Sequence, residues 1–378
     1  MLFNTKFEFY KPLRRDYVIY DKSNSFILRK YLKNSSILHT RNEKLNLYVF
    51  FLNFLKGKFS KRNYIETFIE LINPKIVFTT IDNNPDFYLL KKKKNRKKIL
   101  IQTSSKSPVY DSSIFKQSNG VTKVIKQKGY YVDKIFVFNK YIGKYFKKLN
   151  AKKVISIGSF KSNHFHKRKK KKIDILLISS WNNMHPGHLI SSDFTFAEYQ
   201  KFHDLTLHNL SKYLKKNKFK LHVLSKFSSN DEYHYYKKFF KNINWKFIKK
   251  KSNPYHIVDQ SKVVINFHST LGYESFSRGN KTVFINPFSS KKCMKTTKFG
   301  WPLKLKKNGP FWSTSNSYEI LEKLLTNVIF MKYNKFNLLY SKYAGRLMPY
   351  NQNNSKFINE VLIHEKKFIN HSNTECRR

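Results

Sequence analysis

The feature that most constrains the fold is a regular alternation between short apolar runs and longer amphipathic stretches. In the first half, Lys75–Ile81 (KIVFTTI) is continuous and rich in β-branched residues, which is typical of a strand buried on both faces of a parallel sheet. Leu45–Leu55 and Tyr64–Ile72 have the apolar spacing of helices, and Asn73-Pro74 ends the second. The other elements expected in this half are strands at Asp16–Tyr20, Ile37–His39, Ile99–Thr103, Lys134–Phe138 and Val154–Ile157, with a helix at Lys140–Leu149.

The second half repeats the alternation. Its strands are expected at Ile173–Ser179, Leu221–Leu224, Trp245–Ile248, Lys262–Phe267 and Thr282–Ile285. Its helices are expected at Phe196–Lys215, Glu232–Phe240, Tyr255–Asp259 and Thr270–Ser277. Successive βα units of this kind predict a parallel, doubly wound sheet with helices on both faces in each half.

The length of 378 residues fits two domains of ordinary size. The segment Phe165–Lys172 has no apolar period and is interpreted as the linker between them. We expect an N-terminal Rossmann-like domain over 1–164, a C-terminal Rossmann-like domain over 173–350, and a tail over 351–378. The helix expected in the tail, Asn353–Phe368, can pack back on the first domain. The predicted fold class is α/β, with two Rossmann-like doubly wound domains facing across a cleft.

The formal net charge of +52 attracts nucleic acid, anionic membranes and acidic glycans. It also fits compositional drift in an AT-rich coding sequence, because Lys, Asn, Ile, Phe and Tyr are abundant while Ala, Gly, Pro and Arg are scarce. The basic residues are spread over the chain, and the sequence contains no helix-turn-helix, zinc finger or aromatic RNA-binding motif. Specific binding to nucleic acid is therefore not expected.

Two lysine-rich runs, Lys91–Lys98 and Lys167–Lys172, are either solvated loops or contacts for anionic lipid headgroups. Charged residues interrupt the apolar runs of the first segment, and no later stretch has the length of a membrane span. We expect a cytoplasmic protein, and peripheral contact with an inner membrane surface stays open.

The best candidate for chemistry is Ile265–Asn286 (INFHSTLGYESFSRGNKTVFIN), where a buried strand leads into a helix. In open α/β sheets, anions bind where the carboxyl ends of strands meet helix N-termini. Ser269 or Thr270 can cap the helix and hold a diphosphate, and Gly272 can let a ligand come close. Glu274 can accept hydrogen bonds from a ribose. The alternative is structural: an ordinary cap, a packing glycine and a carboxylate favoured by the helix dipole.

Other strand ends supply further candidates. Asp82 follows a buried strand and can take the proton of an acceptor hydroxyl, or it can stabilise the turn before Pro85. Asp21 is a rival for the same role. The candidates for orienting the acceptor are Asn83, Tyr88 and Gln102.

In the second half, Ser180 and Trp181 follow the first strand, and Trp181 can either stack on a base or pack in the core. His185 and His188 have a metal-like spacing but no third ligand nearby. The two cysteines, Cys293 and Cys376, are not spaced as metal ligands. No metal site is expected.

The segment from Ser269 to Lys281, S-T-L-G-Y-E-x-x-x-R-G-x-K, resembles the donor-binding signature of glycosyltransferases with the two-domain GT-B architecture. It is most similar to bacterial surface-carbohydrate and O-antigen biosynthesis proteins. Further similar pieces, which together cover most of the chain, are Ile76–Tyr88, Ile101–Thr103, Val132–Asn139 and Phe299–Trp312. The chain departs from the pattern at Phe267-His268 and at Thr103-Ser104, so we expect differences on the acceptor side.

The resemblance implies that a nucleotide-sugar donor binds in the C-terminal domain. The residues it assigns to the donor site are Ser269, Thr270 and Gly272 at the phosphates, Tyr273 beside them, and Glu274 at the ribose. Arg278 or Lys281 would balance charge or hold the end of the helix. Ser180 and Trp181 would complete the donor side.

The resemblance further implies a metal-independent glycosyltransferase of lipopolysaccharide or other surface-polysaccharide synthesis, with no cofactor besides its co-substrate. Its partners would be a nucleotide-sugar donor and a glycan or lipid-linked acceptor. Two alternatives on the same fold stay open: a transferase of a polyol phosphate from a cytidine nucleotide, and a nucleotide-sugar epimerase. A basic nucleic-acid-binding protein is the alternative from a different class.

Overall fold

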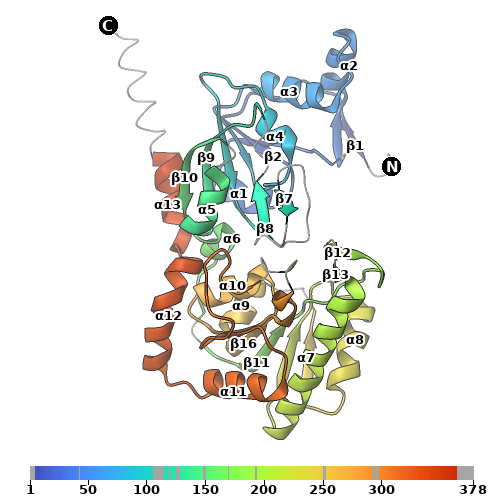
Figure 1. Cartoon of the computed structure of the whole chain (residues 1–378). Helices are drawn as coiled ribbons and strands as arrows, with labels where there is room; N and C mark the ends of the chain where they lie inside the picture. The colour runs from blue at the N-terminus through green and yellow to red at the C-terminus, as the bar shows by residue number, and fades with distance from the viewer. Residues whose placement is uncertain are drawn as a thin grey trace.

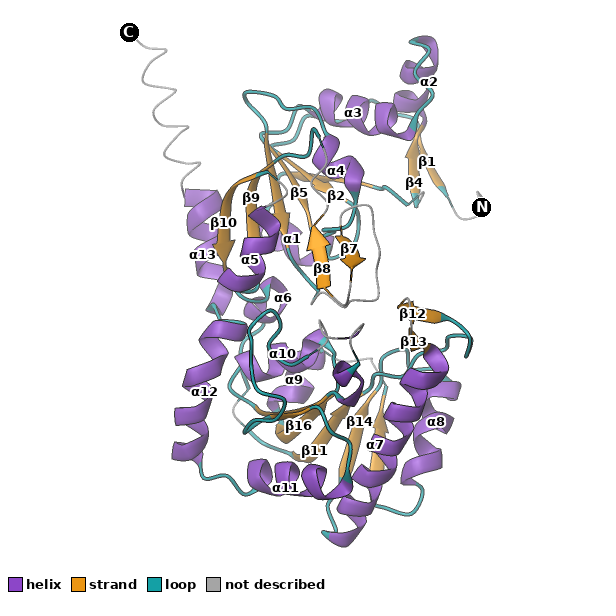
Figure 2. Cartoon of the chain, in the orientation of Figure 1, coloured by secondary structure: helices purple, strands orange, loops and turns teal. Residues whose placement is uncertain are grey.

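Two six-stranded sheets, one in each half of the chain, form the framework of the protein (Figure 1). All neighbouring strands within both sheets are parallel, and helices lie on their faces (Figure 2). The predicted α/β class with two doubly wound sheets is confirmed. The computed structural model describes residues 5–41, 43–104, 115–118, 121–124, 128–147, 150–168, 170–191, 194–249, 253–291, 294 and 298–363.

The N-terminal sheet contains the strands that were expected from the apolar runs. In spatial order they are β10 (Ala151–Ser156), β9 (Val132–Val137), β6 (Lys97–Ile101), β5 (Ile76–Thr79), β2 (Tyr17–Tyr20) and β3 (Ser35–Leu38). The helices of this half are α1 (Ser25–Tyr31), α2 (Leu47–Leu55), α3 (Lys61–Ile72), α4 (Pro85–Leu89), α5 (Lys140–Phe146) and α6 (Phe160–His164).

Alternation along the central strands explains their continuous apolar runs. On β5, Val77 belongs to one buried cluster while Ile76 and Phe78 belong to the cluster on the other face. On β6, Leu100 and Ile101 divide in the same way. Since successive side chains of a strand point to opposite faces, a strand covered on both sides needs an apolar residue at every position.

The C-terminal sheet repeats this arrangement. Its strands, in spatial order, are β15 (Trp245–Ile248), β14 (Leu221–Leu224), β11 (Ile173–Ile178), β16 (Ser261–Asn266), β17 (Lys281–Ile285) and β18 (Trp312–Ser313). The helical segments of this half are α7 (Phe196–Lys216), α8 (Asn230–Phe240), α9 (Pro254–Asp259), α10 (Thr270–Ser277), η2 (Pro287–Ser290), α11 (Tyr318–Ile329) and α12 (Tyr333–Leu347). The edge strand β18 was not predicted, because two residues carry no recognisable period.

Three two-stranded pairings were also missed. They are β1 (Lys6–Glu8) with β4 (Lys44–Asn46), β7 (Phe115–Ser118) with β8 (Val121–Val124), and β12 (Leu189–Ser191) with β13 (Phe194–Thr195).

The last described segments return to the N-terminal half. They are η4 (Gln352–Asn354), α13 (Ser355–Ile358) and the π-helical turn η5 (Asn359–Ile363). Phe357 is fully buried among Phe78, Phe136 and Phe160, with ring centroids 4.9–6.2 Å apart. The remainder of the helix expected up to Phe368, and the rest of the tail, lie outside the described residues.

The linker is held in place by Arg278 at the end of α10. Its guanidinium donates hydrogen bonds to the carbonyl oxygens of Ser162, Phe165 and His166, at 2.8–3.0 Å. It also forms a bidentate pair with Asp259, whose carboxylate accepts further hydrogen bonds from the backbone of Arg168 and the side chain of Asn280. Both charged side chains are buried. The described residues of the linker are therefore tied to α10 and to Asp259 by buried hydrogen bonds.

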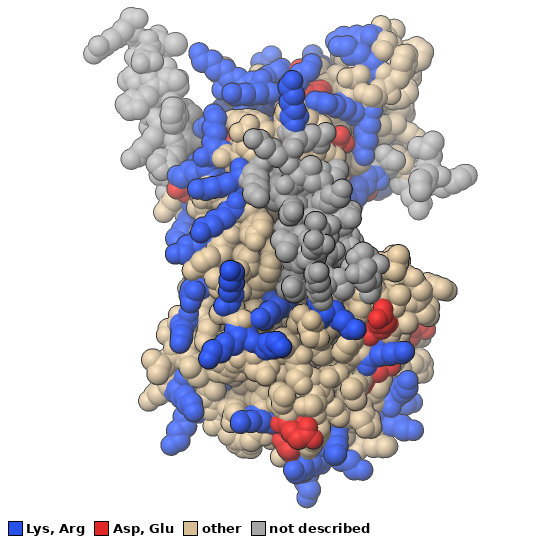
Figure 3. Space-filling model, viewed as in Figure 1, with Lys and Arg blue, Asp and Glu red and all other residues tan. Residues whose placement is uncertain are grey.

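The two lysine-rich runs are partly used inside the protein. Lys98 is buried and donates to the carbonyl oxygens of Tyr88 and Leu90, and burial lowers its pKa to about 8. Lys171 donates to the carbonyl oxygen of Asp259 and to Asn280. For Lys98 and Lys171 the prediction of a solvated loop or a lipid contact is therefore wrong, because their ammonium groups are bonded inside the protein. Elsewhere lysine and arginine are spread over both halves of the surface (Figure 3).

Among the described helices, none combines the length and the apolar composition needed to cross a membrane.

Candidate functional site

A cavity of about 570 Å³ lies where the two halves meet. Its floor comes from the segments that follow the carboxyl ends of β11, β14 and β16 in the C-terminal sheet, and Thr103 and Ser104, which follow β6, line it from the N-terminal half. Lys161 of α6 closes part of the wall. Parallel strands direct their carboxyl ends to one edge of a sheet, and ligands bind at that edge in open α/β folds.

The start of α10 lies on this cavity. Ser269 is the N-cap, and its hydroxyl accepts a hydrogen bond from the backbone N–H of Leu271 at 3.3 Å. Asn266, at the end of β16, fixes the turn by bonding both the N–H and the carbonyl oxygen of Ser269, at 3.2 Å each. Ser269 and Thr270 line the cavity. The positive end of the helix is thus presented to any ligand there.

Glu274 also lines the cavity, although it is buried. Tyr255 donates a hydrogen bond to its Oε1 at 3.1 Å, and Ser159, the N-cap of α6, bonds the same oxygen. Burial raises the pKa of Glu274 above its ordinary value. This carboxylate therefore joins the two halves at the cavity wall, where it can also accept a hydrogen bond from a ligand.

Ser180 reaches the cavity at the end of a buried hydrogen-bond chain that was not predicted. Its Oγ lies 2.6 Å from His203 Nε2, and His203 Nδ1 lies 2.6 Å from the hydroxyl of Tyr235. Tyr235 in turn donates to Asp204. Burial lowers the pKa of His203 to about 3, so the imidazole is neutral at neutral pH.

This hydrogen-bond chain determines which of its atoms carry protons. Because Tyr235 donates to Asp204, its oxygen accepts from His203 Nδ1–H, and His203 Nε2 accepts from the hydroxyl of Ser180. The Ser180 oxygen then has only lone pairs left to offer. It can accept a hydrogen bond from a ligand hydroxyl or N–H.

His268 also lines the cavity, and no role was predicted for it from the sequence. Burial, with a smaller contribution from Lys226, lowers its pKa to about 4. Among the described residues, none is a hydrogen-bond partner of its buried Nδ1. Lys226, which follows β14, lines the same cavity and donates to Asn182 at 3.2 Å. The wall therefore combines basic side chains with a neutral imidazole.

Gly272 has the structural role that was the alternative to a contact with donor phosphates, and it does not line the cavity. A Cβ at this position would lie 2.1–2.5 Å from side-chain atoms of Asn266, closer than real contacts allow. The glycine is therefore required by the Asn266 turn.

Four other residues predicted for the donor site do not line this cavity, and for Arg278 and Trp181 the structure agrees with the structural alternatives of holding a helix end and packing against the core. The Arg278 guanidinium is occupied by Asp259 and the linker. Tyr273 packs in the core, its ring stacked on Phe299 at 5.7 Å and its oxygen accepting from Gly300 N–H. The other two are Lys281, which donates to the carbonyl oxygens of Ile329 and Met331 at the end of α11, and Trp181, which packs edge-on to Phe227 at 5.8 Å.

The predicted acceptor residues do not line this cavity. Tyr88 is fully buried, stacks on Tyr130 at 5.3 Å and donates to the carbonyl oxygen of Asp82. Gln102 accepts from the Phe138 N–H and donates to the Ser104 carbonyl oxygen, at 3.0 and 3.2 Å. Both are structural residues, so the roles predicted for them are corrected.

Asp82 itself is buried in the turn after β5, and Asn83 is exposed there. The rival Asp21 is occupied by hydrogen bonds from Ser23, Thr40 and Arg41. The catalytic role of Asp82 stays a prediction from the sequence, and the cavity wall does not include it.

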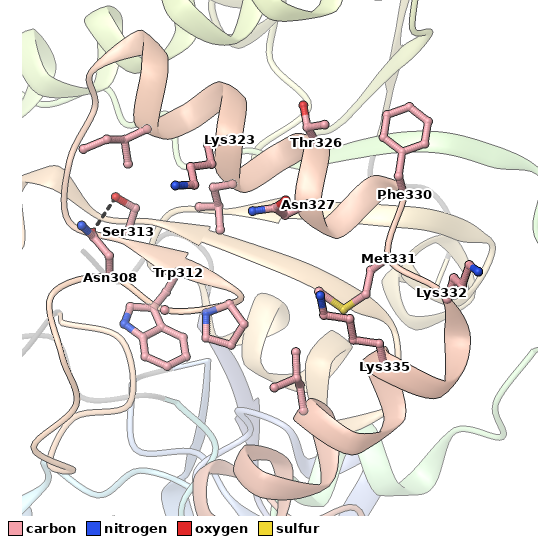
Figure 4. Close-up of a pocket in the computed structure, with 15 residues that line it drawn as sticks. Asn308, Trp312, Ser313, Lys323, Thr326, Asn327, Phe330, Met331, Lys332 and Lys335 are labelled. Carbon is pink, nitrogen blue, oxygen red and sulfur yellow. Dashed lines mark hydrogen bonds between the residues drawn. The ribbon is translucent and has the colours of Figure 1, made fainter.

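A second cavity, of about 740 Å³, lies within the C-terminal half (Figure 4). It is lined by β18, α11, α12 and the preceding loop, and Ser313 donates to Asn308 at its edge. Its charged residues, Lys323, Lys332 and Lys335, are exposed. All its lining residues come from 308–339. It therefore lies neither at the carboxyl ends of β11, β14 and β16 nor against the N-terminal half, as the first cavity does.

Within the described part of the chain, no group of three or more histidine, cysteine, aspartate or glutamate side chains is arranged to hold a metal ion. Cys293 and Cys376 lie outside that part.

Comparison with known proteins places the chain in a family. Residues 99–366 match the family described as "putative O-antigen biosynthesis protein", which is more than half of the chain. The protein belongs to this O-antigen family. No curated protein sequence matches it significantly.

Solved structures show how the O-antigen family protein compares in fold. It is similar to the wall teichoic acid polymerase TagF in its H548A form, with a TM-score of 0.50 at 12% identity over 94% of this chain and 89% of the other. It is also similar to a "putative UDP-N-acetylglucosamine 2-epimerase" from Listeria monocytogenes, with a TM-score of 0.56 at 9% identity over 93% and 97% of the two chains. At this identity the likeness shows the shared two-domain GT-B fold.

Proposed function

We propose that this O-antigen family protein is an enzyme that transfers a sugar or a related group from a nucleotide-activated donor to a glycan or lipid-linked acceptor. The observation that carries the proposal is the cavity between the halves, on which Ser269, Thr270 and Glu274 lie together at the start of α10. Membership of the O-antigen family and the likeness in fold to a wall teichoic acid polymerase and a putative UDP-N-acetylglucosamine 2-epimerase support it.

The wall offers hydrogen-bond donors and positive charge where a diphosphate would lie. The N-terminus of α10 presents backbone N–H groups, and Lys161 and Lys226 line the same space. These groups would stabilise the charge that builds up on a departing nucleoside diphosphate. We therefore propose that transfer needs neither a metal ion nor a further cofactor.

The remaining wall groups suit the sugar or ribose. Glu274 and the Ser180 oxygen accept hydrogen bonds, and hydroxyl groups of a nucleotide sugar donate them. We also propose that the protein works in the cytoplasm.

The test is binding of a donor that depends on Glu274. A thermal-shift panel of UDP-, GDP-, CDP- and dTDP-sugars first identifies the donor, because a ligand that binds only the folded state raises its stability. Glu274→Gln keeps the size of the side chain and removes its charge. It is compared with Glu319→Gln, a surface glutamate in the first turn of α11.

We expect Glu274→Gln to lose the shift and Glu319→Gln to keep it. A shift that is equal in both variants would refute the assignment of the cavity. Two other activities fit the same fold and have their own readouts. A cytidine polyol donor that alone raises stability would indicate a polyol-phosphate transferase, and conversion of a UDP-sugar to its epimer without any acceptor would indicate an epimerase.

A further inference from the structure

The helix α2 exposes an apolar surface that the donor cavity does not explain. Its sequence, LYVFFLNFL, contains no charged residue. Phe51 is 57% exposed and Leu55 is 80% exposed, and Phe59, just after the helix, is 74% exposed. We define the aromatic face as the exposed residues Phe7, Phe9, Tyr10, Phe50, Phe51, Phe54, Leu55 and Phe59.

Strand pairing, a hydrogen bond and ring packing hold these residues in one place. Strand β1, which carries Phe7, pairs with β4, which leads directly into α2. Asn46, the N-cap of α2, donates from its side chain to the carbonyl oxygen of Tyr10 at 3.0 Å. Phe54 and Phe59 pack edge-on, with ring centroids 5.6 Å apart.

Only a narrow side of α2 is packed against the protein. Val49 and Asn53 are its buried residues, and the Asn53 side chain accepts from Thr67 of α3 at 2.9 Å. A surface helix normally turns polar residues outward. By contrast, α2 is uncharged and exposes aromatic residues to water, and an exposed apolar patch of this kind indicates a binding surface.

Positive charge surrounds the aromatic face. The exposed cations next to it in the sequence are Lys6, Lys11, Lys56, Lys58 and Lys61. The one acidic residue of β1, Glu8, is paired with Lys44 at 2.6 Å. In Figure 3, the surface at the position of α2 is uncharged with lysine or arginine beside it. Aromatic side chains bordered by lysine match the interface of an anionic bilayer, where apolar rings enter and cations meet headgroup phosphates.

A groove of about 440 Å³ behind the helix adds to this match. Phe50, Phe54 and Phe59 line it together with Tyr64 of α3, and Lys44, Lys58 and Lys61 are also on its wall. This is an apolar space with ammonium groups beside it, which is the arrangement that an acyl chain and its phosphate need. A second copy of this chain is a poorer occupant, since it would bring like charges together.

We propose that the aromatic face docks the protein on an anionic phospholipid membrane, with α2 lying shallowly in the interface. In Figure 1, α2 is at the outer end of the N-terminal half, away from the C-terminal half. Docking there leaves the cavity between the halves open to solvent. The inference rests on the aromatic face and its cations, and not on the proposed function.

The test is sedimentation of the full chain with vesicles. One set is phosphatidylcholine alone and the other is an equimolar mixture with phosphatidylglycerol. The variant Phe51→Gln/Leu55→Gln/Phe59→Gln removes three apolar groups from the aromatic face. The matched control, Phe330→Gln/Leu338→Gln, removes groups that are 66% and 73% exposed in the C-terminal half.

We expect the wild type and the control to bind the anionic vesicles, and the triple variant to bind them roughly tenfold or more weakly. Equal binding by the triple variant, or no binding by the wild type, would overturn the proposal. Light scattering tests whether a second copy of the chain covers the aromatic face. If the wild type is a dimer and the triple variant a monomer, the face joins two copies and the membrane proposal is wrong.

A second measurement covers the case in which the triple variant does not fold. Leu55→Trp places an indole on the aromatic face, and we expect brominated phosphatidylglycerol to quench it while the signal of the four native tryptophans is unchanged. No additional quenching would contradict insertion. Donor binding by the triple variant, measured by thermal shift, separates this proposal from the proposed function.

Discussion

Replacing Arg278 with methionine tests whether this residue is structural. The change keeps an unbranched chain but removes a buried guanidinium, and it leaves the Asp259 carboxylate buried without its bidentate partner. The carbonyl oxygens of Ser162, Phe165 and His166 lose their hydrogen bonds from Arg278 as well. Breaking a buried ion pair from one side costs about 3–5 kcal/mol.

That loss converts into a measurable shift of the unfolding temperature. We expect a fall of about 4–6 °C if the whole chain unfolds as one unit, and about 8–13 °C if the C-terminal half unfolds alone. Differential scanning calorimetry of Arg278→Met and Arg278→Lys measures it. Lysine should rescue only part of the loss, because a single ammonium cannot form the bidentate pair.

The same variants distinguish the structural role from the donor-binding role that the sequence indicated. Where Arg278→Met is still folded, its donor affinity should equal that of the wild type. A variant with unchanged unfolding temperature but lost donor binding would refute this reasoning.

Further predictions concern the cavity. The pKa of Glu274 is raised in the folded state, so the stability of the wild type falls as the pH rises from the pKa of this group in the unfolded chain through its pKa in the folded protein. Glu274→Gln lacks this loss, so its unfolding temperature relative to that of the wild type should be higher at neutral than at acid pH in thermal melts. Gly272→Ala should destabilise by about 1–3 kcal/mol in denaturant titrations through its clash with Asn266, with donor affinity unchanged. His203→Phe leaves the Ser180 hydroxyl free to rotate, so calorimetric titration should show weaker donor binding, and equal affinity would contradict the fixed proton order.

The parallel sheets could be predicted because their buried strands contain continuous apolar runs. Val77 and Phe78 face different clusters, and such burial leaves a continuous run in the sequence. The start of α10 could be predicted for a similar reason, since the N-cap Ser269 directly follows a buried strand. Local chemistry determines both features.

Roles that depend on distant partners could not be predicted. Arg278 lies within the donor-like motif, yet its partners Asp259 and the linker carbonyls come from other elements. The hydrogen-bond chain from Ser180 to His203 and Tyr235 joins the segment after β11 to the helices α7 and α8. One signal was present: His203 stands four residues from both Tyr199 and Leu207, on the apolar side of its helix, where a polar residue needs a buried partner.

The donor site at the start of α10 is tested most directly by calorimetric titration of the donor found in the thermal-shift panel into the wild type, Glu274→Gln and Glu319→Gln. We expect the wild type and Glu319→Gln to bind with the same affinity and Glu274→Gln to bind at least tenfold more weakly, a loss of about 1.4 kcal/mol. Equal affinity in all three proteins would contradict a donor site at the start of α10.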